Sequence, residues 1–191
     1  MLTEPILVTL LVADAFDALN IPYFIGGSLA TAVHGVARAT MDVDLVADIQ
    51  VEQIPQLLQV LGEAFFADNQ MIENAIRQGM SYNLIHKETM FKVDIFPVKN
   101  RAFDRSQFER RTAYALADEP ERMAYVASPE DIILAKLEWY RLGGEVSDRQ
   151  WQDILNVLKI QGERIDRTYL QHWAEQLMVS NLLQRALEQA T

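Results

Sequence analysis

The sequence predicts an α+β protein, and two features of its pattern lead to this class. Up to about residue 127, short apolar segments typical of strands are interspersed with segments in which apolar residues recur at helical spacing. From Ser128 onward only the helical spacing is present. Because half of the 191 residues are hydrophobic, the chain can bury a sizeable core. We therefore expect a core of strands and helices over 1–127 and a C-terminal helical region over 128–191 that packs on it.

The predicted strands lie in residues 1–127. Thr3-Glu4-Pro5 opens a first helix, and Asn20-Ile21-Pro22 ends it. Tyr23-Phe24-Ile25 is a short strand, Gly26-Gly27 ends it, and Ser28 can cap the next helix. The remaining elements of this part are predicted as strands over 42–46, 81–86, 91–98, 114–117 and 123–126, and as helices over 29–34, 52–66, 71–77 and 101–111.

The helical region begins with a strong start signal. Ser128-Pro129-Glu130-Asp131 combines a capping serine, a proline at the first helical position and acids near the positive end of the helix dipole. This helix ends at Gly143-Gly144, and three more are predicted over 149–160, 167–177 and 180–189.

Composition and charge exclude several classes of protein. There is no cysteine, so disulfides, thiolate zinc sites and cysteine nucleophiles are ruled out. A net charge of −10 disfavours extended binding to DNA. No apolar run reaches the roughly 18 residues needed to span a membrane, and the stretch from Ile6 to Ala13 lacks the features of a signal peptide. We expect a cytoplasmic protein without a membrane partner.

Three acidic residues form the strongest chemical pattern. Asp42 and Asp44 are two residues apart on a predicted strand, so they point to the same face, about 6.6 Å apart. Asp94 alternates in the same way with apolar residues of another strand. Such carboxylates repel one another unless a divalent cation such as Mg²⁺ lies between them. If the two strands are neighbours, the three acids can hold two metal ions for in-line displacement at phosphorus, and Asp94 could accept the proton of the attacking hydroxyl.

The turn Gly26-Gly27-Ser28 is a candidate phosphate site. A strand that ends in glycines and opens a helix lets backbone N–H groups approach a phosphate at the positive end of the helix dipole. Its position one helix before the acid pair favours this interpretation, although an ordinary turn has the same residues.

Three motifs together resemble a known superfamily. They are Gly27-Ser28, the segment Arg38-Ala39-Thr40-Met41-Asp42-Val43-Asp44-Leu45, and Lys92-Val93-Asp94-Ile95-Phe96. This set resembles the nucleotidyltransferase superfamily that includes DNA polymerase beta. More closely, it is similar to an uncharacterised bacterial group related to abortive-infection toxin nucleotidyltransferases, which the helix containing Lys136 and the segment 149–154 also fit.

The resemblance implies a mixed β-sheet with flanking helices and a Mg²⁺- or Mn²⁺-dependent transfer of a nucleoside monophosphate from an NTP. The acceptor, whether protein, RNA or small molecule, is not implied, and a toxin-like role with an antitoxin partner is possible. Asp42, Asp44 and Asp94 would be the catalytic and metal-binding residues. The residues expected to bind the nucleotide are Gly27, Ser28, Arg38 and Lys136.

Each candidate residue also has a structural interpretation. Asp94 could form a salt bridge with Lys92 on its own face, Lys136 could extend to solvent, and Asp153 could be a helix-surface acid. We favour structural roles for His34 and His86. The basic segment 99–111 could contact phosphates, but we favour a solvated helix face.

Two functions are compatible with these patterns. The first is a metal-dependent nucleotidyltransferase, favoured by the three acids. The second is a catalytically silent protein of the same fold that binds a nucleotide or a protein partner. The absence of an evident basic groove for an acceptor favours the second.

Overall fold

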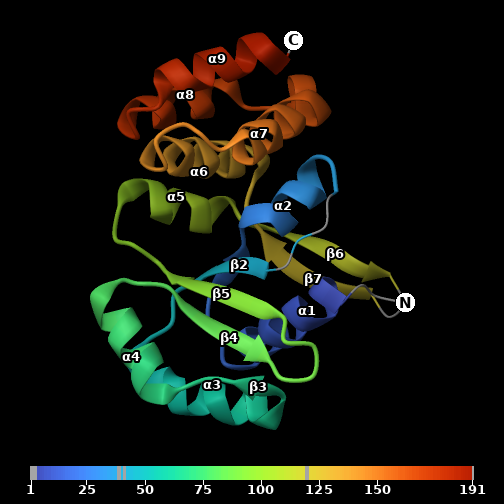
Figure 1. Ribbon diagram of the computed structural model, residues 1–191, viewed down its shortest axis with the longest axis vertical. Coiled ribbons are helices and arrows are strands. Elements are labelled where there is room, and N and C mark those ends of the chain that lie inside the picture. Colours follow the sequence, from blue (N-terminus) through green and yellow to red (C-terminus); the bar gives the residue numbers. More distant parts are fainter. Residues whose placement is uncertain (1–3, 38–39, 41, 119–120, 191) are drawn as a thin grey trace. The chain divides into compact units, whose positions relative to one another are not determined.

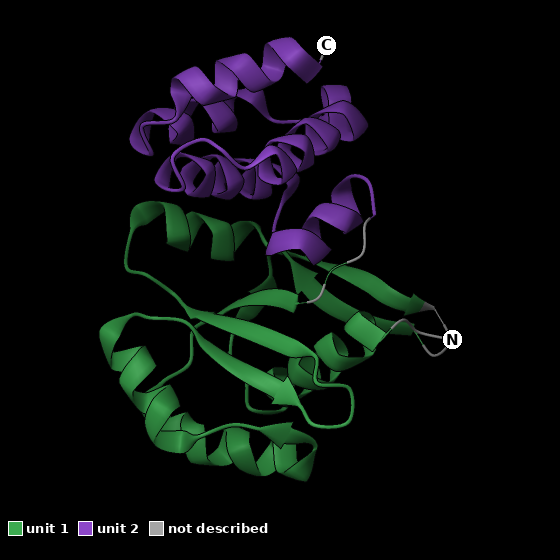
Figure 2. Ribbon diagram, in the orientation of Figure 1, with its two compact units in different colours: residues 1–26, 39–126 green, residues 27–38, 127–191 purple. Residues whose placement is uncertain are grey.

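The computed structural model describes residues 4–37, 40, 42–118 and 121–190. Contacts within the chain divide it into two compact units, shown in Figure 2. One comprises residues 1–26 and 39–126, and we call it the sheet unit because it contains every strand described. The other comprises residues 27–38 and 127–191 and is built from helices, so we call it the helical unit.

The sheet unit is organised around a mixed seven-stranded sheet of order β3-β4-β5-β2-β1-β7-β6 (Figure 1). The pairs β2–β5 and β1–β7 are parallel, and the other neighbouring pairs are antiparallel. The strands are β1 (Tyr23–Ile25), β2 (Asp42–Ala47), β3 (Phe65–Phe66), β4 (Tyr82–His86), β5 (Lys92–Pro97), β6 (Thr112–Asp118) and β7 (Glu121–Val126). Strands and helices in this order confirm the predicted α+β class.

The helices of the sheet unit are α1 (Glu4–Ala18), α3 (Ile54–Leu61), α4 (Asn69–Gln78) and α5 (Ala102–Arg110), with the short 3-10 helices η1 (Val51–Gln53) and η2 (Gly62–Ala64). Helix α1 contacts α3, β2 and β7. Phe16 of α1 packs on Tyr23 of β1 with a ring-centroid distance of 5.6 Å, and both side chains are buried. This side of the sheet therefore forms the core of the unit.

The predicted helix over 52–66 is shorter in the structure. Helix α3 ends at Leu61, and the next residue, Gly62, has a positive φ of 58°, which favours glycine. The chain then forms η2 and enters β3, an edge strand that sequence analysis assigned to the helix. A strand of two residues is too short to show the alternation of apolar and polar residues, so its sequence cannot be distinguished from the end of a helix.

The helical unit consists of α2 (Gly27–His34), α6 (Pro129–Leu142), α7 (Asp148–Gln161), η3 (Gly162–Arg164), α8 (Arg167–Gln176) and α9 (Ser180–Ala190). Ser128 caps α6 as predicted, because its side chain accepts a hydrogen bond from the backbone N–H of Asp131. The core contains Ile133 of α6 and Ile154 of α7, both fully buried. Within the described residues, no helix has the length and apolarity that a membrane span needs.

Helix α2 belongs to the helical unit, although it lies between two strands in the sequence. It contacts both α6 and α7. His34 Nε2 lies 2.9 Å from the carbonyl oxygen of Ala127, and Gln161 Nε2 donates to the carbonyl of His34 at 2.6 Å. Gly35 lies so close to Val157 that an added Cβ would be 3.3 Å from its Cγ2 atom. The compact units thus differ from the predicted ranges 1–127 and 128–191 in placing 27–38 with the later helices.

Candidate active site

The three acids lie on one face of the sheet, on the neighbouring strands β2 and β5. Asp44 is paired in register with Asp94, and Asp42 is paired with Lys92. Paired residues on adjacent strands point to the same side, and so do residues two apart on one strand. Asp42, Asp44 and Asp94 therefore share a face, which we call the acid face. The strand register confirms the prediction that Asp94 joins the face of the other two acids.

The residues between the acids explain why the strands are oriented this way. Val43 and Leu45 of β2, and Val93 and Ile95 of β5, are all fully buried on the opposite side of the sheet. Because strand side chains alternate, burying these four residues forces the acids to the other face.

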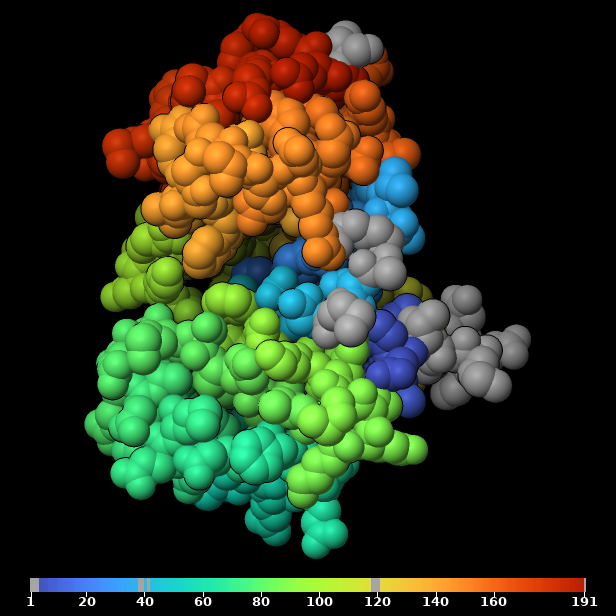
Figure 3. Space-filling view, viewed as in Figure 1, coloured from blue at the N-terminus to red at the C-terminus, as the bar shows by residue number. Residues whose placement is uncertain are grey.

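The acid face continues onto β4 in two rows. Strand β4 pairs with β5 so that Ile85 is opposite Lys92 and Asn83 is opposite Asp94. One row therefore contains Asp42, Lys92 and Ile85, and the next contains Asp44, Asp94 and Asn83. In the space-filling view, the hairpin of β4 and β5 lies at the surface of the sheet unit (Figure 3).

Electrostatic repulsion is present on the acid face. Partial burial raises the pKa of the Asp94 carboxyl, and the negative charge of Asp42 raises it further, while the positive charge of Lys92 acts in the opposite direction. A carboxyl group with a raised pKa is a stronger base than an ordinary aspartate. The face is therefore chemically suited to bind a cation and to accept a proton.

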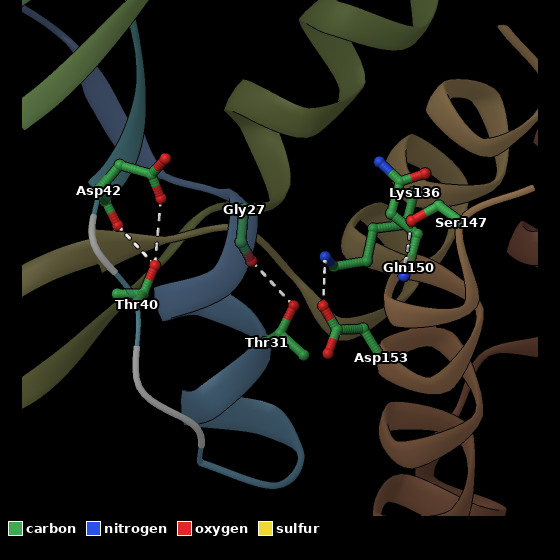
Figure 4. Close-up of polar contacts among 8 residues, drawn as sticks. All are labelled: Gly27, Thr31, Thr40, Asp42, Lys136, Ser147, Gln150 and Asp153. Atoms are coloured by element: carbon green, nitrogen blue, oxygen red, sulfur yellow. Dashed lines mark hydrogen bonds and ion pairs between the residues drawn. The ribbon is translucent and has the colours of Figure 1, made fainter. Parts of the chain in front are cut away.

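Two hydrogen bonds position β2 at the acid face. Thr40 Oγ1 donates to the carbonyl oxygen of Asp42 at 2.8 Å and lies 3.1 Å from its Oδ1 atom (Figure 4). The backbone N–H of Gly26 donates to the carbonyl of Asp44 at 2.8 Å. The end of β1 is thus attached to β2 at the level of the second acid.

The donor set of the acid face matches a hard divalent cation. Carboxylate oxygens are preferred ligands of Mg²⁺ and Mn²⁺, and the register places three carboxylates on adjacent positions. Within the described ranges, however, the side chains as they stand form no group of three or more histidines, cysteines or acids that could hold a metal ion. The residues fit the ion in chemistry and in sheet position, and rotation of the acidic side chains would have to complete the ligand set.

Lys136, predicted to bind phosphate, has a different partner in the structure. Its Nζ atom lies 2.9 Å from Oδ2 of Asp153, and the two side chains are only 11% and 5% exposed. Figure 4 shows the two side chains, from α6 and α7, directed toward each other. Lys136 does not extend to solvent, and the interpretation of Asp153 as a helix-surface acid is wrong. Nucleotide binding by Lys136 stays a prediction, although its charge is already balanced by Asp153.

The glycine turn has a structural reason of its own. Gly27 adopts a left-handed conformation with φ of 52°, which favours glycine whether or not a phosphate is bound. Ser28 lies within the first turn of α2 rather than before it, because the helix begins at Gly27. Arg38 lies outside the described residues. Phosphate binding by Gly27, Ser28 and Arg38 stays a prediction.

Both histidines named above have structural partners. Burial lowers the pKa of His34, whose Nε2 atom contacts the carbonyl of Ala127, so the neutral ring is favoured. His86 is buried in β4, and its Nδ1 atom lies 3.0 Å from Oγ1 of Thr89 in the following turn.

The basic segment 99–111 also has local partners. Arg101 binds Asp104 at 2.8 Å, and Arg105 donates to Asn100 at 2.6 Å. These contacts fit the interpretation of a helix face stabilised within the segment.

Sequence analysis assigned no site role to two polar residues of the acid face. Lys92 appeared only as a possible ion-pair partner of Asp94, and Asn83 was not singled out. Across the part of the chain that the structure describes, Lys92 forms no salt bridge within 4 Å, so that pairing is not observed. The alternation Lys92-Val93-Asp94 was a signal for Lys92, whereas the position of Asn83 depends on the β4–β5 register.

Comparison with known proteins identifies the fold. No family model matches the sequence, and no curated protein matches it. An antigenic nucleotidyltransferase-like protein from Paracoccidioides brasiliensis is similar in structure, with a TM-score of 0.60 and 21% identity over 97% of this chain and 92% of that chain. ANT(2″)-Ia in complex with adenylyl-2″-tobramycin has a TM-score of 0.54 and 16% identity, covering 96% of this chain and 98% of its own.

The lincosamide antibiotic adenylyltransferase LnuA, with lincomycin bound, is also similar. Its TM-score is 0.52 and its identity 19%, over 83% of this chain and 98% of that chain. These similarities extend over most of each chain, and they agree with the mixed sheet that carries the three acids on β2 and β5. The chain therefore has the nucleotidyltransferase fold.

Proposed function

We propose that this protein is a metal-dependent nucleotidyltransferase that transfers a nucleoside monophosphate from an NTP to a hydroxyl group of an acceptor. The observation that carries the proposal is the strand register that pairs Asp44 with Asp94 and brings Asp42 to the same face. The fold shared with two adenylyltransferases supports it.

Each acid has a defined role in this reaction. Asp42 and Asp44 would hold Mg²⁺ or Mn²⁺, with Asp94 as a further ligand. A bound divalent cation supplies charge stabilisation for the attacking and leaving oxygens. The acceptor oxygen forms a bond to the α-phosphorus, the bond from that phosphorus to the bridging oxygen breaks, and pyrophosphate leaves. Asp94 accepts the proton of the acceptor hydroxyl, a role that its raised pKa favours.

Of the three acceptor classes, a small hydroxylated molecule has the most support. ANT(2″)-Ia carries an adenylylated tobramycin, and LnuA carries lincomycin. The net charge of −10 disfavours a long RNA acceptor. A toxin-like role with an antitoxin partner stays a prediction from the sequence resemblance, and an adjacent small reading frame for an antitoxin would support it.

A catalytically silent nucleotide-binding or partner-binding protein is the second candidate. It is favoured by the absence, among the described side chains, of a ready-made group of metal ligands. The two candidates differ in whether the α-phosphorus is transferred, not in whether a nucleotide binds.

A labelling experiment tests the proposal. The protein is incubated with Mg²⁺ or Mn²⁺, a small-molecule extract and protein extract of cells, and each NTP labelled at either the α- or the γ-phosphate. We expect transfer of the α-label but not of the γ-label, and loss of transfer in Asp42→Asn/Asp44→Asn. Calorimetric binding of an NTP by the wild type without any transfer would favour the silent protein instead.

A further inference from the structure

Lys92 occupies a distinctive position on the acid face. It lies directly opposite Asp42 across the β2–β5 pair and two residues before Asp94 on the same side of β5. Its side chain is exposed, whereas its neighbour Val93 is fully buried on the other side. Among the described strand residues, Lys92 is the only lysine or arginine on this face, because Arg122 of β7 points to the opposite face.

The positive charge of Lys92 is not consumed by a direct ion pair. No salt bridge within 4 Å involves Lys92 among the residues described, although Asp42 and Asp94 are its sheet neighbours. Lys136 differs in this respect, because it is buried against Asp153. An exposed ammonium group beside acids, without a fixed partner, is available to an incoming anion.

A triphosphate on the acid face would need such a cation. An NTP carries about four negative charges, and one divalent cation offsets only two of them, while the three acids add further negative charge to the face. A lysine side chain reaches about 6 Å from its Cα, which exceeds the strand spacing of roughly 4.8 Å between Lys92 and Asp42. Phosphate oxygens bound next to Asp42 would therefore lie within its reach.

We infer that Lys92 is a phosphate-binding residue whose ammonium group contacts the outer phosphates of an NTP held on the acid face. The inference rests on the proposed function, since it requires that an NTP binds at these acids. It assigns to β5 the positive charge that sequence analysis placed at Lys136. A lysine that merely relieves repulsion between the acids would influence folding stability, but it would not distinguish a triphosphate from a monophosphate.

Binding measurements separate these roles. Isothermal titration calorimetry with Mg²⁺ compares α,β-methylene-ATP, which cannot donate its nucleotidyl group, with AMP. We expect Lys92→Gln to weaken binding of the triphosphate at least tenfold and of AMP less than twofold, and Lys92→Arg to recover most of the loss. Lys87→Gln is the matched control, because Lys87 is exposed in the β4–β5 turn and its loss changes the net charge equally.

Three results would overturn the inference. The first is unchanged triphosphate binding by a folded Lys92→Gln variant. The second is that Lys92→Gln weakens the binding of triphosphate and of AMP by the same factor. The third is that Lys87→Gln weakens triphosphate binding as much as Lys92→Gln does. Thermal melting of each variant establishes that it is folded. If the wild type binds neither nucleotide, the proposed function fails together with the inference. If the wild type binds the triphosphate and Lys92→Gln binds it equally well, the inference alone fails.

Discussion

The acids of the two units are held in different ways. In the helical unit, Asp131 accepts hydrogen bonds from Ser128 Oγ and Tyr169 OH, both at 2.7 Å, and Asp153 forms an ion pair with Lys136. Asp131 and Asp153 are both buried, and these partners compensate for their burial. In the sheet unit, by contrast, the three acids share a face, and partial burial, together with the negative charge of Asp42, raises the pKa of Asp94.

This difference separates stabilising acids from acids that call for a functional explanation. A buried carboxylate with designated donors contributes to a defined native structure. A carboxyl group whose pKa is raised by burial and by a neighbouring acid costs stability when it is charged, and such groups are concentrated at functional sites. The comparison therefore assigns structural roles to Asp131 and Asp153 and supports the chemical role proposed for the acid face.

The largest expected effect comes from breaking the buried pair of the helical unit. Asp153→Ala leaves the ammonium group of Lys136 buried without its partner, and we expect it to lower the free energy of unfolding by about 3–5 kcal/mol. The double variant Lys136→Met/Asp153→Leu should be much less destabilised, because no uncompensated charge remains. Urea unfolding followed by circular dichroism measures both. Equal losses in the two variants would show that packing, not charge, dominates at this site.

A matched pair of tyrosines gives the next effect. Tyr169→Phe removes the hydroxyl group that donates a hydrogen bond to Asp131, and we expect it to lower the free energy of unfolding by about 1.5–3 kcal/mol. In the sheet unit, the buried hydroxyl of Tyr82 has no hydrogen-bond partner among the described residues, so Tyr82→Phe should be neutral or stabilising by up to about 1 kcal/mol. The same unfolding assay compares them. A destabilised Tyr82→Phe protein would reveal a partner for this hydroxyl in solution.

Divalent cations should act through the acid face. Mg²⁺ or Mn²⁺ that binds the native state raises its stability, by about 1.4 kcal/mol at a concentration ten times the dissociation constant. Asp42→Asn/Asp44→Asn should abolish this rise in melting temperature and should itself be more stable than the wild type without metal. Differential scanning calorimetry measures the melting temperature, and the reference is protein that has been treated with EDTA to remove divalent cations. A wild type indifferent to both ions would support the silent alternative.

The smallest effect concerns the pH dependence of Asp94. Its pKa is higher in the native state than the roughly 3.9 of an unfolded aspartate, so the native state binds more protons between the two values. The stability contributed by the protonated group is present below the unfolded pKa and is lost as the pH rises through the native pKa. Asp94→Asn should therefore gain stability relative to the wild type as the pH rises from about 4, by less than 1 kcal/mol because the group is partly exposed. Thermal unfolding of both metal-free proteins from pH 3.5 to 7 measures the difference in stability between them. A difference that stays constant over this range would contradict the prediction.

The sequence by itself determined the local features of this protein. Strand alternation placed Asp42 and Asp44 on one face because the side-chain period of a strand is two, and the cap at Ser128 was evident from four adjacent residues. These features depend on neighbours in the chain, so they can be deduced without knowing what packs against them.

Only the tertiary structure decided which distant residues meet. The pairing of Asp44 with Asp94, the grouping of α2 with the later helices and the ion pair between Lys136 and Asp153 each join segments separated in sequence. A local pattern does not specify which strands pair or which helices pack together. These pairings are set by the packing of apolar side chains, such as Val43 and Val93, in a shared core. The same packing exposed Lys92 beside the acids and buried Lys136 against Asp153, which neither residue's position in the sequence indicates.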